Sequence, residues 1–107
     1  MLDEIEKTFS LDSVDAVISD MAPNLSGIKP KDEAAWLELV EASMAVALAF
    51  LKENGVFLVK FFQYGDTASA YNRIQSRFKR VQRIKPLSSR ADSPEFYVIA
   101  NEKKMAL

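Results

Sequence analysis

Apolar positions along the chain alternate between short runs that suit strands and longer runs that repeat at helical spacing. Apolar residues three and four apart within residues 2–9 predict a short helix. Residues 14–19 (VDAVIS) are rich in β-branched side chains, which predicts a strand. Residues 20–30 contain two prolines, an asparagine and a glycine, so we expect a loop there.

The longest helical pattern covers residues 32–53. Asp32 is a suitable N-terminal cap, and Asn54 and Gly55 form a pair that commonly stops a helix in the left-handed conformation. The second half of the pattern is apolar nearly all round, which predicts burial on more than one side.

Three further strands and one more helix follow. Residues 56–62 (VFLVKFF) are apolar except for one lysine, which predicts an inner strand covered on both faces. A helix is expected to begin at Asp66 or Thr67. Residues 79–85 predict a charged strand near a sheet edge, and residues 96–100 predict the last strand.

This alternation of strand and helix predicts an α/β fold with a mostly parallel sheet. The last two strands are joined by a loop of about nine residues with no helical pattern. A parallel crossover needs a dozen or more residues, so we expect the last strand to run antiparallel.

Composition narrows the chemistry. The chain has 107 residues, enough for one domain at most, and contains neither cysteine nor histidine. Acid–base chemistry must therefore use Asp, Glu, Lys or Tyr, and no metal site is expected. The acidic N-terminus lacks a signal-peptide core and no apolar run spans a bilayer, so we expect a cytoplasmic protein with no membrane association.

Charge is divided unevenly. Residues 1–72 hold 12 acidic and 5 basic residues, whereas residues 73–107 hold 3 acidic and 9 basic residues. Residues 73–90 contain seven basic residues and no acidic residue. Such a block can attract a polyanion, and it can equally be a solvated surface.

Three ionisable residues are predicted to meet at one rim of the sheet. In open α/β sheets, sites form at the carboxyl ends of the parallel strands. Asp20 ends the first strand, Lys60 lies near the end of the second, and Glu95 begins the antiparallel last strand on the same edge. The alternative is structural, because Lys60 can simply bridge two carboxylates as a buried ion pair. Asp20 can likewise serve only to end its strand by accepting loop amides.

Four segments resemble the FtsJ-type (RrmJ-type) methyltransferases, which modify a ribose 2′-hydroxyl in large-subunit ribosomal RNA. They occur in the family's order, run through essentially the whole chain, and read SDMAPNLSG (19–27), VKFFQ (59–63), KPLSSR (85–90) and SPEFY (93–97).

This resemblance implies a function and a set of site residues. Family members use a Lys–Asp–Lys–Glu tetrad, and its Asp, second Lys and Glu map onto Asp20, Lys60 and Glu95. The second Lys is regarded as the base for the 2′-hydroxyl, and the Asp also lies beside the cofactor, S-adenosylmethionine. The residues expected to contact RNA are Arg73, Arg77, Arg80, Lys85, Ser88, Ser89 and Arg90.

The chain also departs from the family pattern. The family's first Lys and its glycine-rich cofactor loop precede this region, and the three glycines here form no such loop. The resemblance therefore implies the C-terminal half of a Rossmann-like methyltransferase domain across residues 1–107, with three parallel strands, one antiparallel strand and helices on the faces. The strand at residues 14–19 would be an exposed edge, which predicts a homodimer or a complex with a separate N-terminal half. The competing function is a non-catalytic RNA-binding or assembly module.

Overall fold

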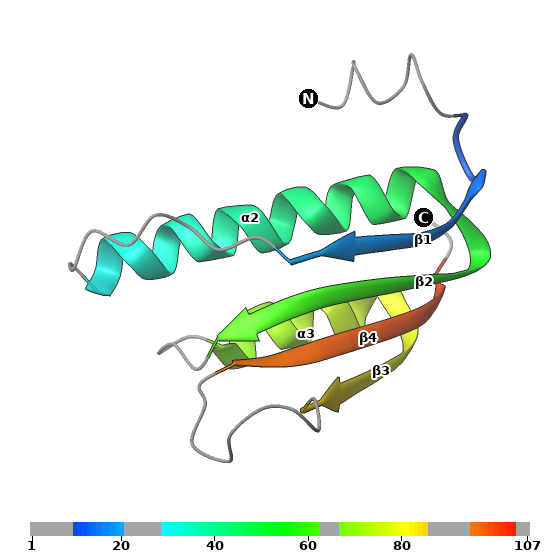
Figure 1. Ribbon diagram of the computed structural model, residues 1–107. Helices are drawn as coiled ribbons and strands as arrows, with labels where there is room; N and C mark the ends of the chain where they lie inside the picture. Colours follow the sequence, from blue (N-terminus) through cyan, green and yellow to red (C-terminus); the bar gives the residue numbers. More distant parts are fainter. Residues whose placement is uncertain (1–9, 21–28, 63–66, 86–94, 105–107) are drawn as a thin grey trace.

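The structure is a computed structural model that describes residues 10–20, 29–62, 67–85 and 95–104 (Figure 1). Its elements, in chain order, are β1 (Val14–Ser19), α2 (Lys29–Phe50), β2 (Leu51–Phe62), α3 (Thr67–Arg77), β3 (Phe78–Ile84) and β4 (Glu95–Lys103). The predicted α/β class is confirmed. The helix predicted over residues 2–9 lies outside the described residues.

The four strands form one sheet in the order β1-β2-β4-β3. β1 pairs with β2 in parallel, and β4 lies between β2 and β3, antiparallel to both. The predicted antiparallel direction of the last strand is therefore confirmed. β1 and β3 occupy the two edges, in agreement with the predicted edge positions of both strands.

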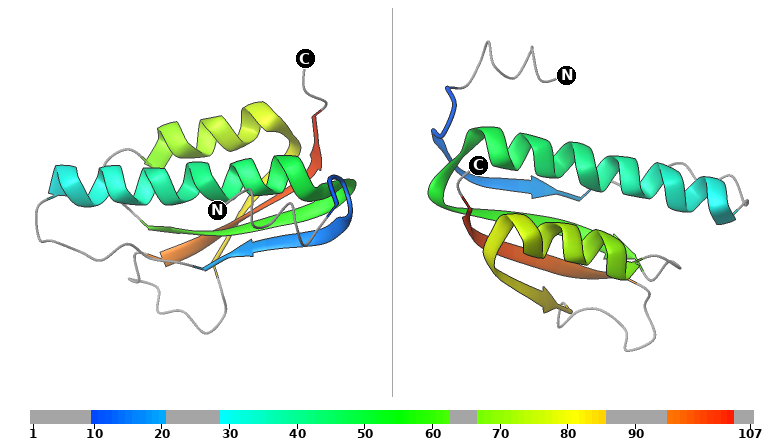
Figure 2. Two further views of the ribbon diagram at one scale, coloured as in Figure 1. Left: turned by 90° about the horizontal axis from the view of Figure 1, so that it is seen from above. Right: turned by 180° about the vertical axis from the view of Figure 1, so that it is seen from behind.

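Both helices lie on the same face of the sheet (Figure 2). They contact each other through an ion pair between Glu41 of α2 and Arg73 of α3. The core forms between these helices and the sheet, and its largest fully buried side chains include Trp36, Phe57 and Phe61. The Trp36 and Phe61 rings meet edge to face with centroids 5.0 Å apart.

This arrangement corrects two predictions about burial. Within the described residues, β2 is covered on one face only, so its apolar residues alternate between buried Phe57 and Val59 and half-buried Val56 and Leu58. The second half of α2 is likewise buried along one stripe, and Ala45 on the far side is exposed. α2 and β2 therefore carry more apolar side chains than the described part of the chain buries.

The predicted boundaries of the long helix were also wrong. α2 begins at Lys29, three residues before the predicted cap Asp32, and ends at Phe50 rather than at residue 53. Its last carbonyls accept hydrogen bonds from the backbone N–H groups of Asp12 (to Ala49, 3.1 Å) and Ser13 (to Phe50, 2.9 Å). Tertiary contacts, rather than a local cap, therefore end this helix.

Gly55 belongs to β2 and does not stop the helix. The pairing of β1 with β2 is irregular between Val14 and Ala16. Gly55 is buried beside this irregularity, where an added Cβ would lie 2.6 Å from Leu51 Cδ2 and 3.1 Å from the carbonyl oxygen of Asp15. A larger residue would force the Leu51 side chain to move and crowd the backbone of β1, so glycine suits this close approach of the two strands.

No helix among the described residues is long and apolar enough to cross a membrane.

Candidate functional site

Asp20, Lys60 and Glu95 meet at one end of the sheet, as the topology predicted. The Lys60 Nζ atom lies 3.4 Å from Asp20 Oδ1 and 3.5 Å from Glu95 Oε1. Asp20 follows the last residue of β1, Lys60 is close to the end of β2, and Glu95 opens β4. Three separate strands therefore supply the three charges.

Strand register places these side chains on one face. Lys60 pairs with Tyr97, and Phe62 pairs with Glu95. Because side chains alternate along a strand, Lys60 projects away from the buried neighbours Val59 and Phe61. The ammonium group thus reaches the rim on the face opposite the helices.

The three groups differ in exposure. The side chain of Lys60 is 18% exposed, whereas those of Asp20 and Glu95 are 58% and 43% exposed. Partial burial lowers the pKa of Lys60, but the carboxylates of Asp20 and then Glu95 outweigh it, so the net pKa of Lys60 is raised. In this arrangement Lys60 is a cation at neutral pH.

Two further residues support Asp20, and the sequence reasoning did not identify either. The Tyr97 hydroxyl donates a hydrogen bond of 3.3 Å to Asp20 Oδ1. On the other side of β1, the Ser43 hydroxyl of α2 lies 2.8 Å from the hydroxyl of buried Ser19, directly before Asp20. Glu95 and Tyr97 are two residues apart in one strand and so share a face, and this spacing could have predicted that Tyr97 lies near Asp20. The contact between Ser43 and Ser19 joins α2 to β1 across 24 positions of sequence, and no local pattern could have predicted it.

Asp20 has a geometry that suits a polar ligand. Among the described residues, Asp20 contacts Lys60 and Tyr97 through Oδ1. A carboxylate has further acceptor capacity, so Asp20 can also accept a hydrogen bond from a hydroxyl or amine at the rim. The described residues contain only one glycine, Gly55 within β2, so they supply no glycine-rich loop for a nucleotide cofactor. Of the residues predicted to bind a cofactor, the structure places Asp20 at the rim, and its role there stays a prediction.

Of the seven residues predicted to contact RNA, the four that the structure describes differ in their contacts. Arg73 is paired with Glu41, and Arg80 is paired with Glu102 at 3.0 Å. Arg77 ends α3 and is exposed, and Lys85 is exposed directly after β3. Ser88, Ser89 and Arg90 lie outside the described residues. RNA contact by all seven stays a prediction.

Arg83 adds a stacking contact to this basic region. Its guanidinium lies 4.6 Å from the centroid of the Tyr71 ring and 5.3 Å from that of the Phe96 ring. Such cation–π contacts hold a guanidinium in place on an otherwise exposed strand.

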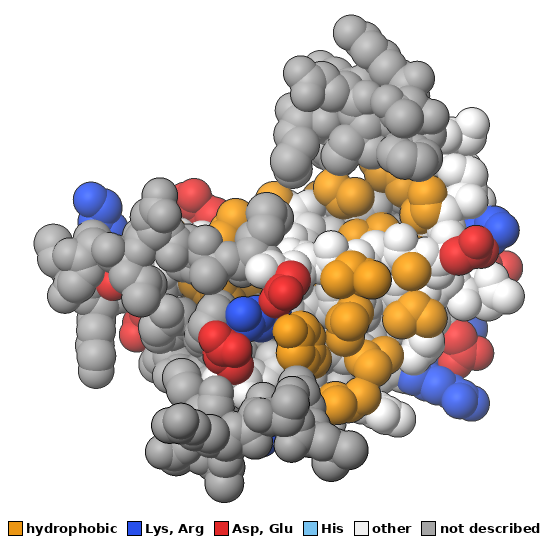
Figure 3. Space-filling model, viewed as in Figure 1, with side chains coloured by type: hydrophobic (Ala, Val, Ile, Leu, Met, Phe, Trp, Pro, Cys, Tyr) orange, Lys and Arg blue, Asp and Glu red, His pale blue; other side chains and the backbone are white. Residues whose placement is uncertain are grey.

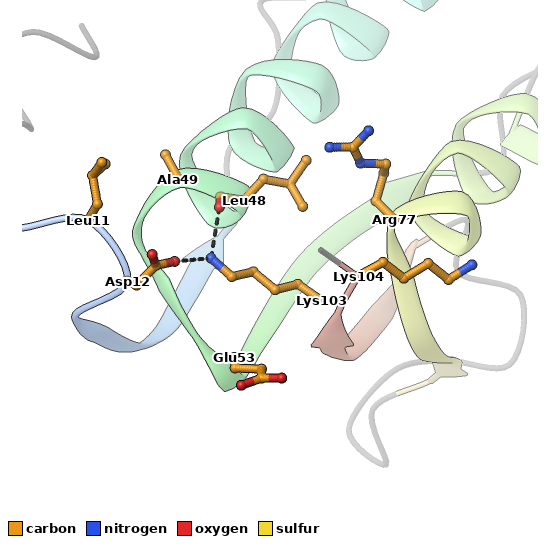
Figure 4. A pocket seen from close by; sticks show the side chains of 8 residues that line it. All are labelled: Leu11, Asp12, Leu48, Ala49, Glu53, Arg77, Lys103 and Lys104. Atoms are coloured by element: carbon orange, nitrogen blue, oxygen red, sulfur yellow. Dashed lines mark hydrogen bonds and ion pairs between the residues drawn. The ribbon is translucent and has the colours of Figure 1, made fainter. Parts of the chain in front are cut away.

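A pocket of about 610 Å³ lies at the opposite end of the sheet from Lys60 (Figure 4). Lys103 lies at its centre, where its ammonium donates a hydrogen bond of 2.9 Å to the Leu48 carbonyl and pairs with Asp12. These contacts hold the C-terminus of α2 against β4 and the start of β1. A cation beside the last carbonyls of a helix is stabilising, so a structural role accounts for this cluster.

Comparison with known proteins identifies relatives of the chain. Residues 1–103 match the family model described as FtsJ-like methyltransferase. The chain is 46% identical over 91 residues to "Ribosomal RNA large subunit methyltransferase E" of Francisella tularensis subsp. novicida, covering 85% of this chain and 44% of that protein. It is 43% identical over 91 residues to "rRNA methyltransferase 2, mitochondrial" of Schizosaccharomyces pombe, covering 85% of this chain and 42% of that protein.

A solved structure has the same fold. The crystal structure of a protein described as a ribosomal RNA methyltransferase from Plasmodium falciparum superposes with a TM-score of 0.70 at 20% identity. The superposition covers 94% of this chain and 53% of the other. The chain therefore spans about half the length of the relatives that it matches.

Proposed function

This chain belongs to the FtsJ-like methyltransferase family, and on that premise we propose that it forms the C-terminal half of an S-adenosylmethionine-dependent RNA ribose 2′-O-methyltransferase. The names of the relatives indicate ribosomal RNA of the large subunit as the substrate. The observation that carries the proposal is the meeting of Asp20, Lys60 and Glu95 at the carboxyl ends of β1 and β2.

Lys60 is the proposed general base. S-adenosylmethionine, when bound, supplies an electrophilic methyl group. The ribose 2′-oxygen would take that methyl group as the bond between the methyl carbon and the sulfonium sulfur breaks, which leaves S-adenosylhomocysteine, and the Nζ atom of Lys60 would accept the 2′-hydroxyl proton. Asp20 and Glu95 hold Nζ in position through the contacts of 3.4 and 3.5 Å. Positioning of this kind supplies a large share of the rate increase.

A base must be neutral, and the two carboxylates oppose that state. They raise the pKa of Lys60, so proton acceptance at neutral pH requires a change in its surroundings. A nearby positive charge and loss of solvent both lower a lysine pKa. The first lysine of the family tetrad, which this chain does not supply, and the sulfonium of the cofactor would provide the positive charge, and bound RNA would exclude solvent.

The proposed site needs residues beyond those of this chain. The described residues provide Asp20 as a contact for the cofactor but no glycine-rich loop. A separate N-terminal half, or a second copy of the chain, would pair with the unpaired edge of β1 at residues 14–19. We therefore expect little methyl transfer by this chain alone.

The competing function is a non-catalytic RNA-binding or assembly module. It is supported by the exposed basic side chains of α3 and β3, among them Arg77, Lys79 and Arg83. Phosphate contacts by such residues need neither a cofactor nor Lys60.

Replacement of Lys60 by Ala in a complex with an N-terminal half tests the catalytic role. We expect methyl transfer to ribosomal RNA to fall by roughly 100-fold or more, since a general base contributes a factor of about 10² to 10⁴. RNA affinity should change little. Lys52→Ala is the matched control, because Lys52 lies in the same strand and pairs with Asp15 at 3.0 Å. Full turnover by Lys60→Ala would remove Lys60 from the role of base.

A further inference from the structure

Two serine hydroxyls lie buried behind Asp20, on the helix side of the sheet. Ser19, the last residue of β1, and Ser43 of α2 are 8% and 7% exposed, and their hydroxyl oxygens are 2.8 Å apart. Ser43 lies on the buried stripe of α2 between the core residues Val40 and Ala47. A buried hydroxyl is costly unless it is hydrogen-bonded, and an apolar pair of the same shape can replace such a pair with little loss of stability. Packing alone therefore does not account for the two serines.

The hydrogen bonds form a chain that runs from α2 to the end of β1. The Ser43 hydroxyl lies 2.8 Å from the carbonyl oxygen of Leu39, four residues earlier in the helix. A carbonyl oxygen can only accept, and a serine hydroxyl has one proton to donate. When Ser43 donates to Leu39, its oxygen is left to accept the proton of Ser19. Ser43 thus supplies the acceptor that holds the Ser19 hydroxyl.

Ser19 links this chain of bonds to the charges at the rim. Side chains alternate along a strand, so Asp20 projects to the face opposite Ser19. Ser19 also pairs with Val59, the residue before Lys60. The contacts of Asp20 Oδ1 are long, 3.4 Å to Lys60 Nζ and 3.3 Å to the Tyr97 hydroxyl, so a small displacement of Asp20 weakens both. Fixing Ser19 therefore fixes the backbone from which Asp20 reaches Lys60.

We infer that Ser43 is a positioning residue of the proposed methyl-transfer site, which holds Asp20 in place beside Lys60 through Ser19. This inference rests on the proposed function and adds a residue to the same site. Figure 3 shows acidic and basic side chains together at the ends of the strands, on the face of the sheet opposite the helices. Ser43 is buried on the other side, so it acts through Asp20 and does not touch the reacting groups.

The titration of Lys60 tests this positioning without any methyl transfer. Ser43→Ala removes the hydrogen bond to the end of β1, so Asp20 is held less firmly and raises the pKa of Lys60 less. We expect the alkaline titration of Lys60, followed by NMR, to shift to lower pH, and by less than in Asp20→Asn. Ser76→Ala is the matched control, because the exposed Ser76 hydroxyl donates to a carbonyl within its own helix, α3. It should leave the titration of Lys60 unchanged.

Further variants separate positioning from a general loss of stability. Ser19→Ala breaks the same hydrogen bond from the other partner, so we expect a shift of the Lys60 titration in the same direction. The double variant Ser19→Ala/Ser43→Ala should shift it no further than the larger single shift, because the two residues act through one bond. Ser43→Thr keeps the hydroxyl and should retain the titration of the unchanged chain. Circular dichroism verifies that each variant is folded.

Methyl transfer is measured on the complex with an N-terminal half. For Ser43→Ala we expect kcat to fall roughly tenfold, because small displacements of a positioned group slow a reaction steeply, while KM for RNA stays unchanged. A raised KM with unchanged kcat would overturn the inference, as would an unchanged Lys60 titration in both Ser43→Ala and Ser19→Ala. Full turnover by Lys60→Ala would instead contradict the proposed function, and a shifted Lys60 titration in Ser43→Ala would still show that Ser43 positions Asp20.

Discussion

At the scale of single residues, Lys60 shows how one strand position acquires its properties from neighbours far away in sequence. Alternation along β2 directs it away from the core, and strand register brings Asp20 and Glu95 to it. The sequence predicted this meeting because the direction of β4 followed from the length of its connection. Tyr97 and Ser43 were missed because their contacts depend on side-chain geometry and helix placement that spacing alone does not reveal.

The raised pKa of Lys60 leads to a prediction at this scale. Removing one carboxylate should lower the pKa of Lys60, because only the other carboxylate then opposes the lowering of the pKa by burial. We expect Asp20→Asn to shift the alkaline titration of the Lys60 side chain, followed by NMR, to lower pH. Asp15→Asn, which affects the partner of Lys52, is the control. An unchanged Lys60 titration in Asp20→Asn would contradict this assignment of the cause.

The same shift has a consequence for stability. Because the pKa of Lys60 is raised in the folded state, its ion pairs contribute fully to the free energy of unfolding below the pKa of lysine in the unfolded chain, which is about 10.4. This contribution is lost as pH rises through the folded-state pKa. The difference in unfolding free energy between the unchanged chain and Lys60→Met should therefore narrow only in strongly alkaline solution.

At the scale of elements, β1 was predicted with its exact bounds and β3 to within one residue, because short runs of strand residues have clear ends. β2 begins at Leu51, five residues before its predicted start, and β4 extends three residues beyond its predicted end. The predicted end of α2 was wrong because Asn54 and Gly55 resemble a local signal that stops a helix, whereas α2 ends at Phe50. In fact, backbone groups of Asp12 and Ser13 satisfy the last carbonyls of the helix. That contact comes from a distant segment and leaves no local pattern.

Gly55 provides a test of this correction. Gly55→Ala would place a Cβ 2.6 Å from Leu51 Cδ2 and 3.1 Å from two carbonyl oxygens, those of Asp15 and Lys52. We expect it to lower the free energy of unfolding by roughly 1–3 kcal/mol, as overpacking in a dense region does. Asn54→Ala, at the exposed neighbouring position, should change it by less than about 0.5 kcal/mol. Urea unfolding measures both, and equal stability of the two variants would argue against the close approach.

The basic residues of helix α3 and strand β3 are predicted to bind RNA. Binding through phosphate contacts releases counterions, so affinity should fall steeply as salt increases. Arg77→Ala should weaken binding and reduce the slope of log K against log salt by about 1. Filter binding across a salt series measures this, and Lys52→Ala, at an ion-paired site on β2, is the control. Affinity that is insensitive to salt would remove the basic elements from RNA recognition.

At the scale of the whole molecule, this chain joins the three charges of the proposed site to a four-stranded sheet, and it spans about half the length of its relatives. Its described sheet has one covered face, one open face and an unpaired edge at β1. The sequence predicted the open edge but not the open face. An apolar strand such as β2 has the same pattern whether its second cover comes from the same chain or from another.

Cofactor binding distinguishes the chain from the complete site. Asp20 is the only described residue that we assign to S-adenosylmethionine, and a single exposed carboxylate makes too few contacts for measurable affinity. We expect titration calorimetry to detect no heat when S-adenosylmethionine is added to the chain alone. The complex with an N-terminal half should bind the cofactor, and Asp20→Ala in that complex should weaken binding. Clear binding by the isolated chain would show that the site is more complete than its described residues indicate, and it would make a stand-alone enzyme the better interpretation.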